Sequence, residues 1–110
     1  YSNEVKENIL GVKPETLQNY GAVSQQVVEQ MAFGVKDKLK TNYAIAVSGI
    51  AGPDGGSAEK PVGTVWIAIA NNKGVISSEL RLTSDRTRNI IRSSVTALNM
   101  LRLMLIDENL

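Results

Sequence analysis

The spacing of apolar residues predicts two helices in the first half of the chain. Val5, Ile9 and Leu10 form a short apolar stripe behind a possible cap at Ser2-Asn3, and Gly11 stands where a glycine ends a helix. Pro14 to Leu17 indicates one further turn. Ser24 can cap a second helix, and its predicted buried face consists of Val28, Met31, Ala32, Val35 and Leu39.

A longer helix is predicted after Ser84, which is placed to cap it, with Asp85 in the positive first turn. Apolar residues recur along it at helical spacing. They predict the face that packs on the rest of the protein, made of Ile91, Val95, Leu98, Leu101 and Leu105.

Between these helices lie three short apolar runs that predict strands, at residues 43–47, 64–70 and 75–82. An Asn-rich turn at 71–74 favours an antiparallel hairpin between the last two. Helices alternating with strands predict an α/β fold with a mixed sheet. Three strands are few for a sheet covered on both faces, so either the fold is minimal or the sheet has strands outside this sequence.

The composition is that of one globular domain, with 110 residues, 43% hydrophobic and 21% charged. The net charge of +1 gives no basis for a nucleic-acid partner. No apolar run approaches the roughly 20 residues of a membrane span. The first residues lack the basic and apolar regions of a signal peptide, so we expect a cytoplasmic protein and no membrane partner.

The chain contains no Cys and no His. This excludes a Cys nucleophile, a His base, a Cys/His zinc site and a Ser-His-Asp triad within the sequence. Acid–base chemistry falls to Lys, Asp, Glu or Tyr, and a nucleophile must be Ser, Thr, Lys or a carboxylate. The sequence has no spaced cluster of acidic residues that would form a metal site. We therefore expect no metal and no cofactor.

The connection SGIAGPDGGSAEKPVG, residues 48–63, joins two predicted core strands. A glycine-rich stretch is often only a turn, but loops longer than about 12 residues lean towards function. Successive backbone N–H groups in such a loop can hold phosphate or carboxylate oxygens. Ser48, Ser57, Lys60 and Thr64 add side-chain donors. The stretch matches neither a Walker A nor a Rossmann motif, so the residues alone leave a turn and an anion site as alternatives.

The segment SGIAGPDGGSAEKPVGTVWIAIA closely resembles the signature of the CinA C-terminal domain family, which includes nicotinamide-nucleotide amidases of the PncC type. YSNEVKENILGV, GAVSQQVVEQMAFGV and SDRTRNIIRSSVTALNMLR agree in order and spacing. The resemblance covers nearly all 110 residues. It implies a three-layer α/β/α sandwich with a mixed sheet, and hydrolysis of the carboxamide of nicotinamide mononucleotide to nicotinic acid mononucleotide and ammonia.

The resemblance also implies that residues 1–110 are part of a domain. Family members carry a further strand, a helix and a motif like AESC[ST]GG before the YSNE segment, and that motif is thought to provide a hydroxyl nucleophile. We therefore expect a sheet that lacks its first strand and helix, and a chain that is inactive alone.

The resemblance assigns roles to particular residues. Lys6 matches the Lys of YSNE-x-K and is the expected catalytic base, with Tyr1 beside it; the alternative for Lys6 is a solvated lysine on a short helix. The expected substrate-binding residues lie in the loop and at the start of the last helix: Ser48, Gly49, Ile50, Ala51, Gly52, Gly55, Gly56, Lys60 and Arg86. Lys60 is equally explained as a solvated loop lysine. Arg88 and Arg92 fit either an anion site or a solvated face.

A rival hypothesis is a non-catalytic nucleotide-binding or regulatory module that keeps the glycine-rich pocket. The family resemblance further implies a homodimer, with apolar residues 103–106 as a possible contact surface.

Overall fold

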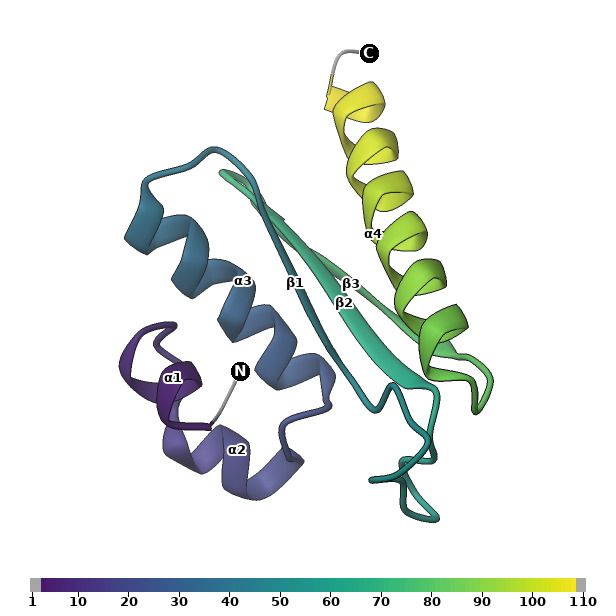
Figure 1. The fold of residues 1–110 in the computed structure, drawn as a ribbon. Helices are drawn as coiled ribbons and strands as arrows, with labels where there is room; N and C mark the ends of the chain where they lie inside the picture. The colour runs from purple at the N-terminus through teal and green to yellow at the C-terminus, as the bar shows by residue number, and fades with distance from the viewer. Residues whose placement is uncertain (1–2, 109–110) are drawn as a thin grey trace.

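Three layers make up the computed structural model, which describes residues 3–108 (Figure 1). α3 covers one face of the sheet, the short helices α1 and α2 lie on the same side as α3, and α4 covers the other face. The elements in chain order are α1 Asn3–Asn8, α2 Pro14–Tyr20, α3 Gln25–Leu39, β1 Ala44–Gly49, β2 Thr64–Asn71, β3 Gly74–Arg81 and α4 Arg86–Glu108. The α/β class and the helix cover on both faces are confirmed.

The sheet has the order β1-β2-β3, and both neighbouring pairs are antiparallel. Val47 pairs with Ile67, and Ile69 pairs with Ile76. The predicted hairpin between β2 and β3 is present. Its turn is stabilised by the Asn71 side chain, which accepts hydrogen bonds from the N–H groups of Lys73 and Gly74, both at 2.9 Å. Within residues 3–108 the sheet is antiparallel throughout, so the parallel pairing of a mixed sheet does not occur in this part of the chain.

α3 begins where the sequence predicts, because the Ser24 hydroxyl accepts a hydrogen bond from the N–H of Val27 at 3.3 Å. It packs on the sheet through Val27, Val28, Met31 and Ala32. Leu39 is predicted in this face but is 66% exposed at the helix end, where Lys40 turns into the left-handed conformation. The predicted cap at Ser2 lies outside the described residues.

The sheet meets α3 with an alanine patch, four buried residues whose side chains are single methyl groups. Two come from β1 and two from β2, and they pair across the strands: Ala44 with Ala70, and Ala46 with Ala68. Methyl groups allow the helix backbone to approach closely, and interiors packed at crystal density leave little free volume at such a contact.

The packed face of α4 differs from the predicted one. Its buried residues are Asn89, Ser93 and Ala97, whereas Ile91, Val95 and Leu98 are 57%, 61% and 63% exposed. Small side chains bring this helix close to the sheet, and the Ser93 hydroxyl donates to the Asn89 carbonyl at 2.7 Å. Leu101 is partly buried and Leu105 is 37% exposed. Large apolar residues at helical spacing therefore mark an outward stripe in this chain.

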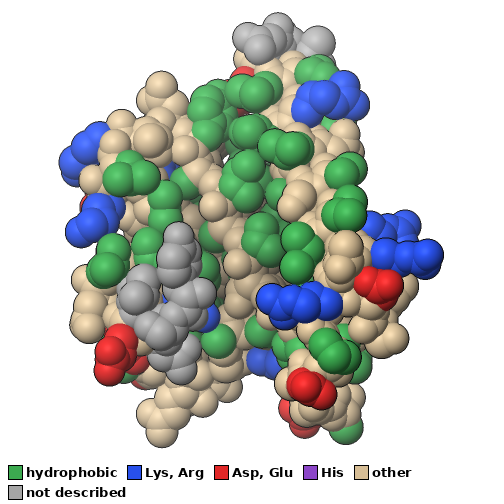
Figure 2. All heavy atoms as spheres, in the orientation of Figure 1, with side chains coloured by type: hydrophobic (Ala, Val, Ile, Leu, Met, Phe, Trp, Pro, Cys, Tyr) green, Lys and Arg blue, Asp and Glu red, His purple; other side chains and the backbone are tan. Residues whose placement is uncertain are grey.

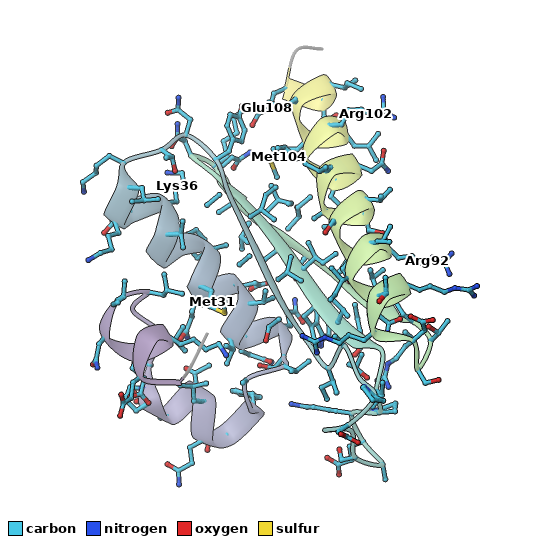
Figure 3. The ribbon with its side chains drawn as sticks, viewed as in Figure 1. Met31, Lys36, Arg92, Arg102, Met104 and Glu108 are labelled. Atoms are coloured by element: carbon cyan, nitrogen blue, oxygen red, sulfur yellow. The ribbon has the colours of Figure 1, made fainter. Side chains whose placement is uncertain are left out.

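The two ends of α4 are both fixed. Asp85, not Ser84, caps its start, since the Asp85 Oδ1 accepts from the N–H of Arg88 at 3.0 Å. At the other end Glu108 accepts hydrogen bonds from the Tyr43 hydroxyl and from Asn71 Nδ2 (Figure 3). Among the helices described, neither α4 nor any other combines the length and apolar character needed to cross a membrane.

Candidate functional site

Residues 50–63 form the glycine-rich loop that joins β1 to β2. The base of the loop is tightly paired. The N–H of Ile50 donates to the Thr64 carbonyl at 2.9 Å, and the N–H of Gly63 donates to the Ile50 carbonyl at 2.7 Å. Ile50 therefore extends the strand pairing, and its N–H is already engaged inside the protein rather than offered to a ligand.

Beyond this base, several backbone donors of the loop are not used within the chain. In the part of the chain that the structure describes, the N–H groups of Ala51, Gly52, Gly55 and Gly56 donate no intramolecular hydrogen bond. Gly52 and Gly55 have φ angles of 95° and 98°, which residues with a side chain rarely adopt. The unused N–H groups form two pairs on either side of Pro53 and Asp54, and such pairs can donate hydrogen bonds to an anionic oxygen.

A cavity of about 200 Å³ lies between the root of this loop, the sheet and the first turns of α4. Its walls are mostly apolar, with a few polar groups at the α4 side. The lining residues are Val47, Gly49, Ala51, Val65, Asn89, Ile90, Ser93 and Ser94. Gly49 and Ala51, two of the predicted binding residues, thus share a cavity with the start of α4.

Asn89 connects the loop to α4, although nothing in the sequence singles it out. Its side chain is 1% exposed. Its Nδ2 donates to the carbonyls of Ala51 (2.9 Å) and Thr83 (2.7 Å), and its Oδ1 accepts from the N–H and hydroxyl of Thr83, both at 3.0 Å. The one pattern that could have found it is its spacing of four from Ser93 and eight from Ala97, which places all three on one helix face.

Arg86 approaches the loop from the same direction. Its Nη1 donates to the Gly52 carbonyl at 3.3 Å, so one guanidinium lies beside the unused N–H groups. Arg92, by contrast, is exposed and points away from the sheet (Figure 3). The solvated-face interpretation therefore fits Arg92, while Arg86 is the arginine that the fold brings to the loop.

Ser48 and Lys60 make contacts on the opposite side of the sheet. The Ser48 hydroxyl donates to the Ala22 carbonyl at 2.7 Å, and the Lys60 ammonium donates to the Tyr20 carbonyl. Both acceptors lie where α2 ends and the chain turns towards α3. The structure thus uses these two predicted binding residues to hold that connection against β1 and the loop, and does not place them in the cavity beside Asn89.

Lys6 lies in α1, on the α3 side of the sheet (Figure 1). The residue is only 6% exposed, and burial lowers the pKa of its ammonium group below the ordinary value of 10.5. The alternative of a solvated lysine is therefore wrong. Lys6 does not line the cavity beside Asn89, which opens on the α4 side. Tyr1 lies outside the described residues. No cluster of three or more potential metal-ligating side chains occurs among residues 3–108.

Comparisons with known proteins cover nearly all of the chain. Residues 1–105 match the model of a family described as the CinA C-terminal domain. A CinA-like protein of Shewanella woodyi is 56% identical over 110 residues, which are 98% of this chain and 26% of that protein. This chain therefore spans about a quarter of the length of the curated relatives it matches.

Solved structures give the same result. The competence/damage inducible protein CihA from Agrobacterium tumefaciens matches with a TM-score of 0.91 and 47% identity, over 94% of this chain and 64% of that one. A CinA superfamily protein from Enterobacter cloacae matches with a TM-score of 0.90 and 35% identity, over 96% of this chain and 62% of that one.

Proposed function

Since this chain belongs to the CinA C-terminal domain family, we propose that it forms part of a nicotinamide-nucleotide amidase. The substrate is nicotinamide mononucleotide, and the products are nicotinic acid mononucleotide and ammonia. The observation that carries the proposal is the burial of Lys6. Lysine side chains are almost always exposed, and a buried one with a lowered pKa holds more of its neutral, proton-accepting form near pH 7 than an ordinary lysine does.

In this proposal Lys6 is the general base. Its amine takes the proton from a hydroxyl group supplied from outside residues 3–108, and the hydroxyl oxygen attacks the carboxamide carbon. The tetrahedral oxyanion collapses, the proton on Lys6 passes to the carboxamide nitrogen, and the carbon–nitrogen bond breaks to release ammonia. Water then hydrolyses the ester that remains on the hydroxyl, which releases the carboxylic acid and regenerates the starting group.

The loop supplies donors for an anionic group. Its unused N–H groups and the Arg86 guanidinium can donate hydrogen bonds to negatively charged oxygens. Because Arg86 and the loop lie away from α1, they fit the phosphate of the nucleotide better than the reacting amide.

The direct test is release of ammonia from nicotinamide mononucleotide by a chimera in which these 110 residues replace the matching part of the Agrobacterium tumefaciens relative. Lys6→Met is expected to lower kcat by at least about a hundredfold, the usual contribution of a positioned base. Lys13→Met, which changes an exposed lysine after α1, is the matched control and should keep full activity.

Binding is measured separately, on the 110-residue chain, by the shift of backbone amide signals on addition of nicotinamide mononucleotide. Shifts in the loop that weaken in Arg86→Ala support the phosphate role. Saturable binding by the chimera with no ammonia release would favour the regulatory module instead. Turnover unaffected by Lys6→Met would remove Lys6 from the mechanism.

A further inference from the structure

Three consecutive carbonyl oxygens at the root of the glycine-rich loop, those of residues 50–52, each accept a hydrogen bond from another part of the chain. The donors are, in that order, the Gly63 N–H (2.7 Å), Asn89 Nδ2 (2.9 Å) and Arg86 Nη1 (3.3 Å). The N–H groups of Ala51 and Gly52 in the same segment donate to no acceptor in the described part of the chain. The loop root therefore offers donors to a ligand while its acceptors are already engaged.

The held carbonyls also fix the direction of the unused N–H groups. In a planar trans peptide unit the C=O and N–H bonds point in opposite directions. The Ala51 carbonyl and the Gly52 N–H belong to one such unit, and its peptide bond is trans. Because Asn89 holds the carbonyl, the Gly52 N–H points away from Asn89 and the start of α4.

Asn89 is itself held in a single orientation. Its Oδ1 faces two donors of Thr83, the N–H and the hydroxyl, while its Nδ2 faces the carbonyls of Thr83 and Ala51. Exchanging the two ends of the amide would place its donors against donors and its acceptor against acceptors. The side chain is 1% exposed, so water does not compete for these bonds. Asn89 thus sets the direction of the Ala51–Gly52 peptide firmly.

Few cationic side chains are available to an anion at this place. Figure 2 shows hydrophobic side chains in a band over the middle of the face between the α3 layer and α4, with most Lys and Arg side chains at its margins. Lys60 of the loop donates to the Tyr20 carbonyl instead. Recognition of an anion at the loop root therefore depends on Arg86 and on the backbone donors.

We propose that Asn89 is a positioning residue for the phosphate of the nucleotide. By holding the Ala51 carbonyl it directs the Gly52 N–H towards a phosphate oxygen. A phosphate dianion has acceptors only, so it fits a segment whose donors are unused and whose acceptors are engaged. The inference rests on the proposed function for the identity of the anion, and it concerns binding of the nucleotide rather than its hydrolysis.

The first test measures nicotinamide mononucleotide binding by the chimera described above, using calorimetry at pH 8. Asn89→Asp keeps the size of the side chain but places a carboxylate oxygen against the Ala51 carbonyl, which turns the peptide away. Affinity is expected to fall by at least about tenfold, the usual effect of losing one hydrogen bond to a charged group.

A change of pH separates this role from a merely structural one. Burial raises the pKa of the introduced carboxyl, and once protonated that group can again donate to the Ala51 carbonyl. The ratio of wild-type to variant affinity should therefore shrink between pH 8 and pH 5. Using the ratio removes the effect of phosphate protonation, which is common to both proteins.

Two control variants accompany this test. Asn99→Asp makes the same chemical change at an exposed position of α4. Ile67→Ala removes part of a side chain that is 0% exposed in the core, and so lowers stability without touching the loop. Both should change nucleotide affinity by less than about twofold.

A second measurement needs no substitution. In the isotope-labelled wild-type chimera, nicotinamide mononucleotide should shift the amide signals of Ala51 and Gly52. The Ile50 amide already donates to the Thr64 carbonyl and should shift little. Nicotinamide riboside, which lacks the phosphate, should leave the Ala51 and Gly52 signals in place.

The role of Asn89 is overturned if the nucleotide does not bind, if Asn89→Asp binds as tightly as the wild type, or if Ile67→Ala weakens binding equally. Equal shifts of the Gly52 amide with the riboside and the mononucleotide would also overturn it. A chimera that binds as described but releases no ammonia would refute the amidase and still support the role of Asn89.

Discussion

Asn89 is 1% exposed, and both polar atoms of its side chain form hydrogen bonds within the protein. It holds the Ala51 carbonyl on the loop and three groups of Thr83 in the turn before α4, so its four hydrogen bonds fix the start of the helix against the loop. Removing it would leave several of these groups buried without partners, which costs more than the hydrogen bonds themselves contribute.

Asn89→Ala is expected to lower the free energy of unfolding by about 2–3 kcal/mol, from the loss of buried hydrogen bonds. Urea denaturation measures the change. Asn99→Ala, an exposed position on the same helix, should alter stability by less than about 0.5 kcal/mol. Equal effects of the two substitutions would show that Asn89 is not the connection described.

Lys6 predicts a pH dependence of stability. Burial lowers its pKa, so the unfolded chain holds the Lys6 proton more tightly than the folded chain does. The free energy of unfolding should therefore gain from Lys6 as pH rises from its lowered pKa towards the ordinary value of 10.5, and lose that contribution as pH falls back through the lowered pKa. Lys6→Met should flatten this part of the profile, measured by urea denaturation at several pH values, while Lys13→Met should leave it intact.

Residues of this kind are hard to recognise in the sequence. Lys6 and Asn89 are polar, and polar residues at helical positions are usually solvated. The family resemblance points to Lys6, but its burial follows only from the packing of α1. Ser48 and Lys60 are predicted at the site, whereas the acceptors they use, Ala22 and Tyr20, lie far from them in the chain.

At the scale of elements, strand positions, the hairpin and the cap of α3 can all be predicted, because each depends on local patterns. The orientation of α4 cannot. Its apolar periodicity is real, but in its first half the helix packs through Asn89, Ser93 and Ala97, and the larger residues Ile91, Val95 and Leu98 face outward. The spacing of apolar residues identifies an apolar face of a helix. It does not say which element packs on that face, or whether that element lies within these residues.

This orientation gives a paired prediction. Ile67→Ala, at a side chain that is 0% exposed, is expected to cost about 2–4 kcal/mol of stability. Leu98→Ala removes a side chain that is 63% exposed and should cost less than about 1 kcal/mol. Thermal or urea unfolding of the two variants measures both losses of stability. A larger loss for Leu98→Ala than for Ile67→Ala would show that α4 packs through the apolar face predicted from the sequence.

At the scale of the whole molecule, the two sides of the sheet are unequally covered. Three helices lie on one side, and α4 alone lies on the other, over β1 and β2. The family resemblance implies the three layers but not this imbalance, because the number of elements does not reveal how much of the sheet each one covers. On the α4 side β3 is the least covered strand, and its Ile76 is 47% exposed there.

The alanine patch beneath α3 links this layered arrangement to the loop. Replacing Ala68 with valine would add two carbon atoms where the structure has room for a methyl group, and α3 would have to move outward. The chain just before α3 is tied to the end of β1 by the Ser48–Ala22 hydrogen bond. Such a shift of α3 would be transmitted through the Ser48–Ala22 hydrogen bond to the end of β1, where the glycine-rich loop begins, so the spacing between α3 and the sheet also positions the start of that loop.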